Sequence, residues 1–243
     1  MLPVIQLESL VVLKAELQTA LPAIGACHRV EAMARGLGFN TYASLRAALN
    51  KGPVSSQPQD ETFRSYLSSL GGDVGERVLS RALARVGVRR AMEMEPHLTT
   101  TGYGIAWQYY KTADERRAAL KELREELLSD WSADQFELAC IYLAKLDRRK
   151  TINRDFTSYN LKHQAERLSR DRNEHTHLGN YVCNGILIAA ALAAGFQVRP
   201  VAWDSLNGFL NASTRSVRRE RTGQLVSRQA MTALWSAVRA DAA

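Results

Sequence analysis

Apolar residues recur three or four positions apart through most of this chain, and this spacing restricts its fold more than any other feature. Residues 5–20, for example, place Leu7, Leu10, Val11 and Leu17 along one stripe. Such spacing gives a helix one apolar face that can be buried against a neighbour. Strand-like runs are few and short. The sequence therefore predicts a mainly α fold, a multi-helix bundle with at most a few short strands.

One polar stretch interrupts this helical pattern. Residues 50–61, "NKGPVSSQPQDE", hold two prolines, a glycine and two serines without periodicity. This composition is typical of a linker. We therefore expect a small helical N-terminal domain over residues 1–50, a linker over 51–60 and a larger helical C-terminal domain over 61–243.

Positive charge is the main compositional bias. The 243 residues carry a formal net charge of +7, which favours contact with nucleic acid or with an acidic protein surface. The excess is uneven, because residues 213–228 combine one acidic residue with five arginines. These are Arg215, Arg218, Arg219, Arg221 and Arg228. The segment is either a solvated connection before the last helix or a site for phosphate or an acidic partner.

Cysteine usage and hydropathy favour a cytoplasmic location. The three cysteines are odd in number and widely spaced, and no charged and apolar leader opens the chain. The longest apolar stretch, residues 185–196, is shorter than the roughly 18 residues that a membrane span needs. We therefore expect no membrane insertion.

The densest group of chemically active side chains lies in residues 170–185, "RDRNEHTHLGNYVCNG". His175, His177 and Cys183 have the ligand types that zinc prefers, and Glu174 could add a fourth ligand. The surrounding residues are uniformly polar, however, as in an exposed loop between two helices. The favoured interpretation is a polar connection without metal, with Cys183 as a small buried side chain.

Patterns for catalysis and cofactor binding are missing from the sequence. It contains no G-x-S-x-G nucleophile elbow, no Walker-type phosphate loop and no G-x-G-x-x-G. Its adjacent carboxylates lie in charged helical segments, where solvated faces are common. The sequence thus predicts a protein that is not an enzyme and has no cofactor.

Aromatic and basic residues alternate in "GYGIAWQYYK", which holds Trp107, Tyr109, Tyr110 and Lys111. Such residues can stack on single-stranded bases or anchor a protein interface. The favoured interpretation is a packed aromatic corner in a short strand or irregular hairpin.

Residues 31–49 and 189–210 resemble each other. Both consist of a small helix, Gly-Phe, a spacer and a polar residue that could cap a second helix containing Ser-Leu. Each could form a helix-turn-helix unit. Neither second helix carries the Arg, Gln and Asn residues of a DNA-recognition face, so plain packing is favoured.

Residues 158–196 resemble a pattern found in small proteins of conjugative plasmids and integrative elements. The pattern is S-Y-x-L-K-H-x-x-E, a spacer, and Y-V-x-N-G-x-L-I-A-A-A-x-x-x-G-F. His175 and His177 fall in the spacer, outside the matching residues. Residues 34–45 are similar to the A-x-x-L-G-F-x-x-[WY]-x-x-L segment of several mobile-element proteins. The resemblance implies a plasmid accessory protein of a bacterial host, such as a conjugation (fertility) inhibitor.

Two functions follow as hypotheses. The first is a non-enzymatic protein that binds an acidic component of the conjugative transfer machinery and inhibits transfer of a competing plasmid. Its expected contact surface is basic and partly aromatic. It would comprise Arg215, Arg218, Arg219, Arg221, Arg228, Trp107, Tyr109 and Tyr110. The alternative is a DNA-binding regulator or plasmid-maintenance protein that uses its basic helical segments.

Overall fold

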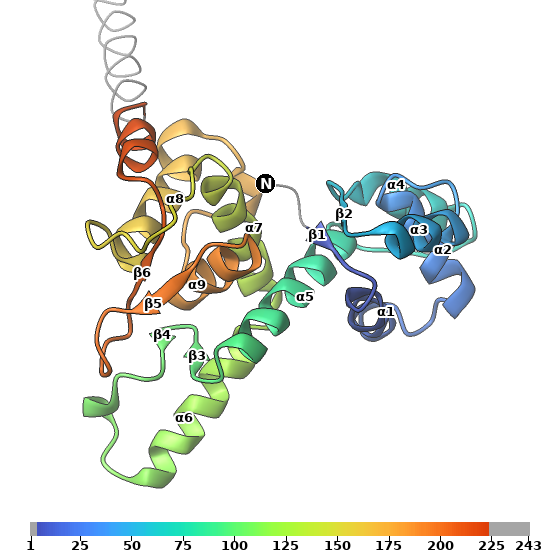
Figure 1. The fold of residues 1–243 in the computed structure, drawn as a ribbon. Helices are drawn as coiled ribbons and strands as arrows, with labels where there is room; N and C mark the ends of the chain where they lie inside the picture. The colour runs from blue at the N-terminus through green and yellow to red at the C-terminus, as the bar shows by residue number, and fades with distance from the viewer. Residues whose placement is uncertain (1–3, 224–243) are drawn as a thin grey trace, which may run out of the picture. The chain divides into compact units, whose positions relative to one another are not determined.

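The computed structural model describes residues 4–223 and is mainly helical, with a few short antiparallel strand pairs (Figure 1). This confirms the predicted fold class. The chain divides between Glu93 and Met94 into two compact units. We call residues 4–93 the N-terminal unit and residues 94–223 the C-terminal unit.

The N-terminal unit is a small helical bundle. Its elements are β1 (Val4–Ile5), α1 (Ser9–Ala20), α2 (Ala26–Gly36), α3 (Tyr42–Lys51), β2 (Val54–Ser55), α4 (Asp60–Ser68) and α5 (Val78–Met94), which ends at the boundary. Helix α2 packs against α1, α3 and α4. Their apolar faces meet in one core, whose largest fully buried side chains include Leu13, Met33 and Phe63.

Two acidic side chains tie α5 to this bundle. The carboxylate of Glu16 on α1 is almost buried and accepts hydrogen bonds from Arg85 Nε at 2.8 Å and Arg89 Nε at 2.6 Å. Asp60 Oδ1 accepts the backbone N–H of Leu79 at 2.9 Å. Because the first N–H groups of a helix have no partner within it, Asp60 satisfies the start of α5.

The boundary expected at residues 51–60 lies inside the N-terminal unit. β2 of this segment pairs with β1, with Ile5 opposite Val54. Ser56 Oγ and Gln59 N donate to backbone carbonyls of residues 36–37 at 2.7 and 2.8 Å. Beyond it, α4 contributes to the same core as α2. These polar residues are thus a surface connection that pairs with neighbouring backbone, which composition alone does not reveal.

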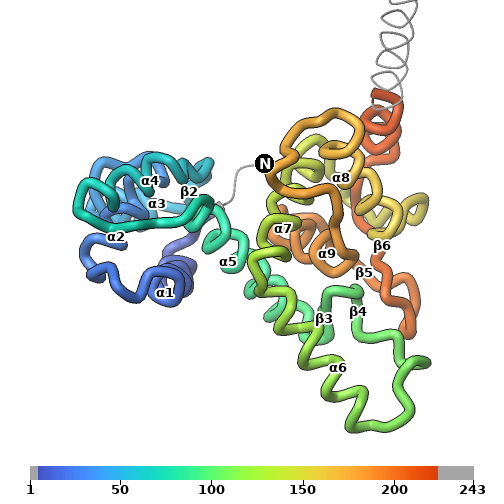
Figure 2. The backbone as a smooth tube through the Cα atoms, turned by 180° about the vertical axis from the view of Figure 1, so that it is seen from behind, coloured from blue at the N-terminus to red at the C-terminus, as the bar shows by residue number. Residues whose placement is uncertain are grey.

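The C-terminal unit contains several helices and two hairpins (Figure 2). Its helices are α6 (Ala113–Glu126), α7 (Asp130–Leu143), α8 (Ser158–Arg172), α9 (Asn184–Ala193), the short η1 (Trp107–Tyr109) and η2 (Thr176–Leu178), and the helical residues 214–223. Its antiparallel hairpins are β3 (Leu98–Thr99) with β4 (Gly102–Tyr103), and β5 (Val198–Pro200) with β6 (Gly208–Leu210).

Helix α9 is the centre of this unit. It is buried from Asn184 to Ala191 and packs against α7 and α8, as expected for a helix that is apolar on all sides. At Gly185, an added Cβ would lie 1.6 Å from the Thr99 carbonyl oxygen, so β3 approaches the helix backbone directly. None of the helices in residues 4–223 has the length and hydropathy that a bilayer span requires.

The helix-turn-helix unit expected over residues 189–210 does not form. Both Gly-Phe segments end a helix in the same way, with Gly38 at φ 83° and Gly195 at φ 77°, the left-handed conformation that glycine adopts without strain. After Gly38, Thr41 caps α3 as predicted. After Gly195, by contrast, residues 198–210 form the β5–β6 hairpin. Only the first copy has a second helix.

Candidate functional site

Residues 174–183, which contain the candidate metal ligands, lie in different environments. His175 is half-buried, His177 is exposed, and their ring centroids are 6.3 Å apart. Cys183 is buried and precedes the first turn of α9, where its backbone N–H donates to Gln135 Oε1 at 2.7 Å. Burial raises the pKa of the Cys183 thiol to about 12, which disfavours the thiolate that binds metal.

Among the residues that the structure describes, no group of three or more His, Cys, Asp or Glu side chains is arranged to hold a metal ion. Glu174 lies 4.0 Å from Lys145 Nζ. The two histidines and the cysteine are therefore not brought together into one site.

The residues of the S-Y-x-L-K-H-x-x-E pattern do converge, around a buried carboxylate on α8. Glu166 Oε1 pairs with Lys162 Nζ at 2.9 Å and accepts the backbone N–H of Val182 at 3.2 Å. Glu166 Oε2 lies 2.7 Å from His163 Nδ1. Both Lys162 and Glu166 are buried, so each charge requires the other. These contacts hold the connection before α9 against α8.

Two tyrosine rings face the lysine of this ion pair, and a partly exposed tryptophan stacks on one of them. Lys162 Nζ is 5.1 Å from the centroid of the Tyr159 ring and 4.8 Å from that of Tyr181. Trp131, at the start of α7, stacks on Tyr181 at 5.5 Å with an interplanar angle of 11°. Burial and then the nearby Cys183 and Glu166 raise the pKa of Tyr181. The lysine charge thus already occupies the space between the two tyrosine faces.

A second polar group joins the pattern's Ser and Asn to both hairpins. Ser158 Oγ donates to Asn184 Oδ1 at 2.7 Å and accepts the N–H of Gly208 at 3.0 Å. Asn184 Nδ2 donates to the carbonyls of Leu206 and Thr101 at 2.8 and 3.1 Å. The polar residues of the pattern therefore mostly bond to one another or to the backbone, and they position helices and hairpins.

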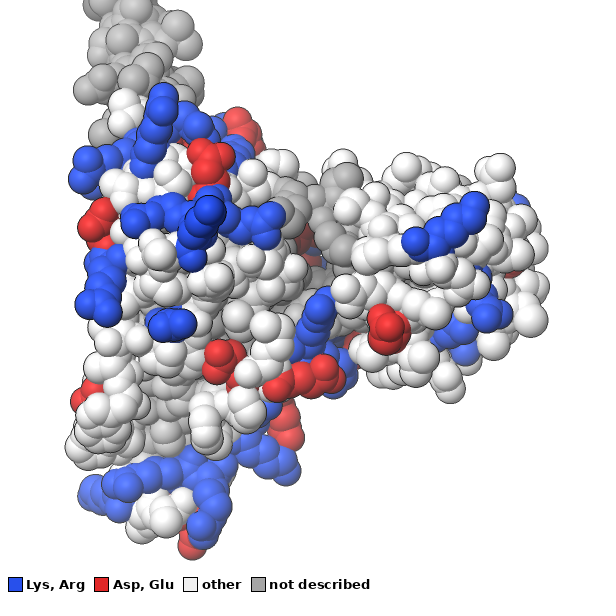
Figure 3. Space-filling view, in the orientation of Figure 1, with Lys and Arg blue, Asp and Glu red and all other residues white. Residues whose placement is uncertain are grey.

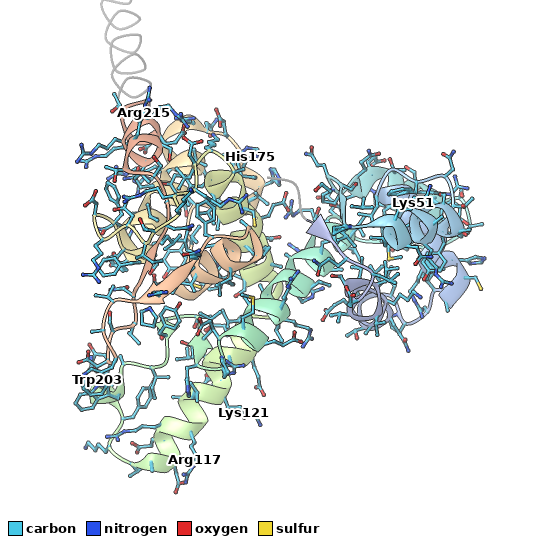
Figure 4. All side chains as sticks on the ribbon, in the orientation of Figure 1. Lys51, Arg117, Lys121, His175, Trp203 and Arg215 are labelled. Atoms are coloured by element: carbon cyan, nitrogen blue, oxygen red, sulfur yellow. The ribbon has the colours of Figure 1, made fainter. Side chains whose placement is uncertain are left out.

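The C-terminal arginines lie beside a second basic segment that is distant in the sequence. Residues 145–155 and 213–221 together contain nine Lys and Arg against three Asp and Glu. We call them the basic surface. Its cations are Lys145, Arg148, Arg149, Lys150, Arg154, Arg215, Arg218, Arg219 and Arg221. Figure 3 shows Lys and Arg gathered at this end of the C-terminal unit, where Figure 4 labels Arg215.

Hydrogen bonds fix the two segments of the basic surface against each other. Arg149 N donates to Asn211 O at 2.7 Å, and Ser213 N donates to Asp147 O at 2.8 Å. Arg219 donates to the Lys145 carbonyl at 2.9 Å. In contrast, the side chains of Arg215, Arg218 and Arg221 are exposed and make no hydrogen bond or ion pair within residues 4–223. Arg228 lies outside the described residues.

The expected aromatic contact residues lie elsewhere. Trp107 and Tyr109 are exposed on η1, and Tyr110 is half-buried beside them. Residues 104–112 connect β4 to the start of α6, at the end of the C-terminal unit opposite residues 214–223 (Figures 1 and 2). The expected single surface, basic and partly aromatic, is therefore two separate surfaces. Trp107 and Tyr109 are also not the packed corner that the sequence favoured.

Sequence reasoning missed half of the basic surface. The signal was present as "KLDRRK" at residues 145–150, but nothing local indicates that this loop meets residues 213–221. It also missed Trp203, which is 95% exposed in the loop between β5 and β6.

No protein-family model, curated protein or solved structure matches this chain.

Proposed function

We propose that this protein is a non-catalytic binding protein whose basic surface docks on an acidic partner protein. The observation that carries the proposal is the hydrogen-bonded junction of residues 145–155 with 213–221, which presents two groups of cations on one fixed backbone. A backbone that is already ordered loses less entropy on binding. The concentrated positive charge accelerates encounter with an acidic surface.

The arginines of this surface fall into two groups. Arg148 donates to the carbonyl of Gly195 at 3.2 Å, after the end of α9, and Arg219 bonds to the carbonyl of Lys145. Both therefore support the surface itself. Arg215, Arg218 and Arg221 have no such role, and their guanidinium groups are suited to carboxylates in a bidentate geometry. We assign the partner contact to these three.

The resemblance of residues 158–196 to proteins of conjugative elements suggests the partner class. The partner would be a cytoplasmic component of the transfer machinery of a competing plasmid, and binding would inhibit transfer. A nucleic-acid ligand is the second candidate, because a dense group of arginines also fits phosphates.

The test removes the three free arginines without disturbing the junction. We expect Arg215→Gln, Arg218→Gln and Arg221→Gln together to weaken inhibition of plasmid transfer in a donor cell about tenfold or more. Thermal unfolding should stay unchanged. A matched variant with Arg46→Gln, Lys51→Gln and Lys121→Gln removes the same charge at other exposed positions, and it should inhibit as the wild type does.

A pull-down from cells that carry a conjugative plasmid separates the two candidates. Capture of a transfer protein that resists nuclease and is lost in the triple arginine variant supports the proposal. Loss of capture after nuclease treatment, with binding to duplex DNA that falls steeply with salt, would favour the nucleic-acid alternative. Equal inhibition by both triple variants would remove the basic surface from the mechanism.

A further inference from the structure

The end of the C-terminal unit opposite the basic surface carries three exposed aromatic side chains. Trp107 is 55% exposed, Tyr109 78% and Trp203 95%. We call these three residues the aromatic tip. Rings of this size bury much apolar surface when they contact a partner. Two tryptophans and a tyrosine that are exposed on adjacent loops therefore indicate a contact site.

The two loops of the aromatic tip are held together by backbone hydrogen bonds. Tyr103 N donates to Leu206 O at 3.0 Å, and Asn184 Nδ2 also donates to that carbonyl. Ser205 N donates to Ala202 O at 3.2 Å, so Trp203 lies within a turn. Residues 201–206 and the loop after β4 lie side by side in both Figure 1 and Figure 2. The rings are thus presented on a fixed backbone.

Cations flank these rings. Arg116 on α6 places its guanidinium carbon 6.0 Å from the centroid of the Trp107 ring and donates to the carbonyl of Tyr110 at 3.2 Å. Lys111 and Arg117 are exposed nearby, and Arg117 pairs with Asp114. Figure 3 shows Lys and Arg at this end of the unit, and Figure 4 shows Arg117 and Trp203 there.

We propose that the aromatic tip binds single-stranded nucleic acid. Unpaired bases stack on aromatic side chains, and nearby cations contact the phosphates that link them. The aromatic tip provides both elements, with the rings on two loops and the cations at the start of α6. Duplex DNA fits less well, because its base faces are already stacked on one another. The basic surface does not offer this combination, because its two segments contain cations but no exposed tryptophan.

The experiment titrates the full-length protein into a labelled dT oligomer of about 15 nucleotides, which covers the usual site sizes of such proteins. We expect binding at low salt, with quenching of tryptophan fluorescence. Trp203→Ala should weaken binding roughly 5- to 150-fold, the loss that follows removal of one stacked base. Because this side chain is 95% exposed, the substitution should leave the fold intact.

Matched variants locate the site. Trp131→Ala removes another exposed tryptophan, at 51%, which stacks on Tyr181 rather than on the tip, and it should bind dT as the wild type does. Lys111→Gln with Arg116→Gln should reduce the salt dependence of binding, by about 0.7 in log–log slope for each lost contact. The triple variant of Arg215, Arg218 and Arg221 should retain dT binding, which separates this proposal from the proposed function.

Three results would overturn the proposal. One is unchanged dT affinity in both Trp203→Ala and Trp107→Ala. Another is equal or tighter binding of a duplex of the same length. The third is absence of dT binding at low salt together with binding of an acidic peptide, which would make the aromatic tip a protein-docking site.

Discussion

The two units each bury a carboxylate between two basic side chains, but they use it differently. In the N-terminal unit, Glu16 joins α1 to Arg85 and Arg89 on α5, which are 69 and 73 residues away in sequence. In the C-terminal unit, Glu166 pairs with Lys162 and His163 one turn earlier on the same helix. The basic partners of Glu16 therefore lie on another helix, whereas those of Glu166 lie on its own helix and only its contact with the Val182 N–H reaches another segment.

The surroundings of the cations differ as well. Arg85 is 13% exposed in its side chain and pairs across two helices with the buried carboxylate of Glu16. Lys162 is 6% exposed, but two tyrosine rings face its ammonium group. Cation–π attraction compensates part of the lost ion pair there. The comparison thus predicts that removing the carboxylate costs more in the N-terminal unit than in the C-terminal unit.

The largest expected effect is that of Glu16→Ala. It removes the buried carboxylate that accepts hydrogen bonds from Arg85 and Arg89, so we expect a loss of about 3–5 kcal/mol from the stability of the N-terminal unit. Hydrogen exchange of amides in α1 and α5 measures this loss within the unit. Glu61→Ala is the control, because the Glu61–Arg64 pair is exposed and should contribute under about 1 kcal/mol. Equal effects of the two substitutions would contradict the role given to Glu16.

Two helical glycines, one in each unit, extend the comparison to backbone packing. Gly185→Ala would place a Cβ 1.6 Å from a backbone oxygen of β3, whereas at Gly36 the nearest obstacle is the end of the Leu79 side chain. Backbone moves less readily than a side-chain end, so we expect a loss of about 3 kcal/mol at Gly185 and about 1 kcal/mol at Gly36. Chemical denaturation of the two variants, followed by hydrogen exchange in each unit, tests this order.

Glu166→Gln should cost about 2 kcal/mol, because the amide can still accept the N–H of Val182 while Lys162 loses its counter-ion. The rings should also reorient, since Trp131 stacks on Tyr181 beside this lysine. Tryptophan fluorescence therefore reports the change. Adding Lys162→Met removes the unpaired charge and should restore part of the stability, which a double-mutant cycle measures. A purely additive double variant would mean that the two side chains are not coupled.

The sequence predicted most of the local structure. Thr41 and Thr157 each cap a helix with a side chain that accepts the N–H three residues later, a signal carried entirely by neighbouring residues. Thr112 caps α6 in the same way, although it was not among the predicted caps. The sequence also predicted part of residues 157–196, namely that the alanine-rich α9 is buried and that Gly195 ends it.

Where contacts between distant segments determine the local structure, the sequence did not predict it. The composition of residues 51–60 favoured a linker, yet β1 pairs with them from the start of the chain. The second Gly-Phe copy favoured a helix, yet residues 208–210 pair with 198–200. The junction that forms the basic surface and the hydrogen bond from Tyr103 N to Leu206 O both join segments far apart in sequence. Neither has a local signature that could have revealed it.

The smallest expected effect concerns alkaline pH in the C-terminal unit. Burial raises the pKa of the Cys183 thiol from 9.0 to about 12, so the folded state keeps the proton between these values while the unfolded state releases it. The stability from this thiol is therefore complete below pH 9 and is lost as the pH rises towards 12. At pH 10 the loss should be about 1 kcal/mol.

Cys183→Ser isolates this contribution, because the tyrosines whose pKa values are raised by burial, such as Tyr142, remain in both proteins. The difference in unfolding free energy between wild type and variant should shrink by about 1 kcal/mol between pH 8 and pH 10. Alkylation of Cys183 at pH 8 should also require opening of the unit, whereas Cys27 on α2 is exposed. Rapid modification of Cys183 in the native protein would show that the segment before α9 opens without the rest of the unit.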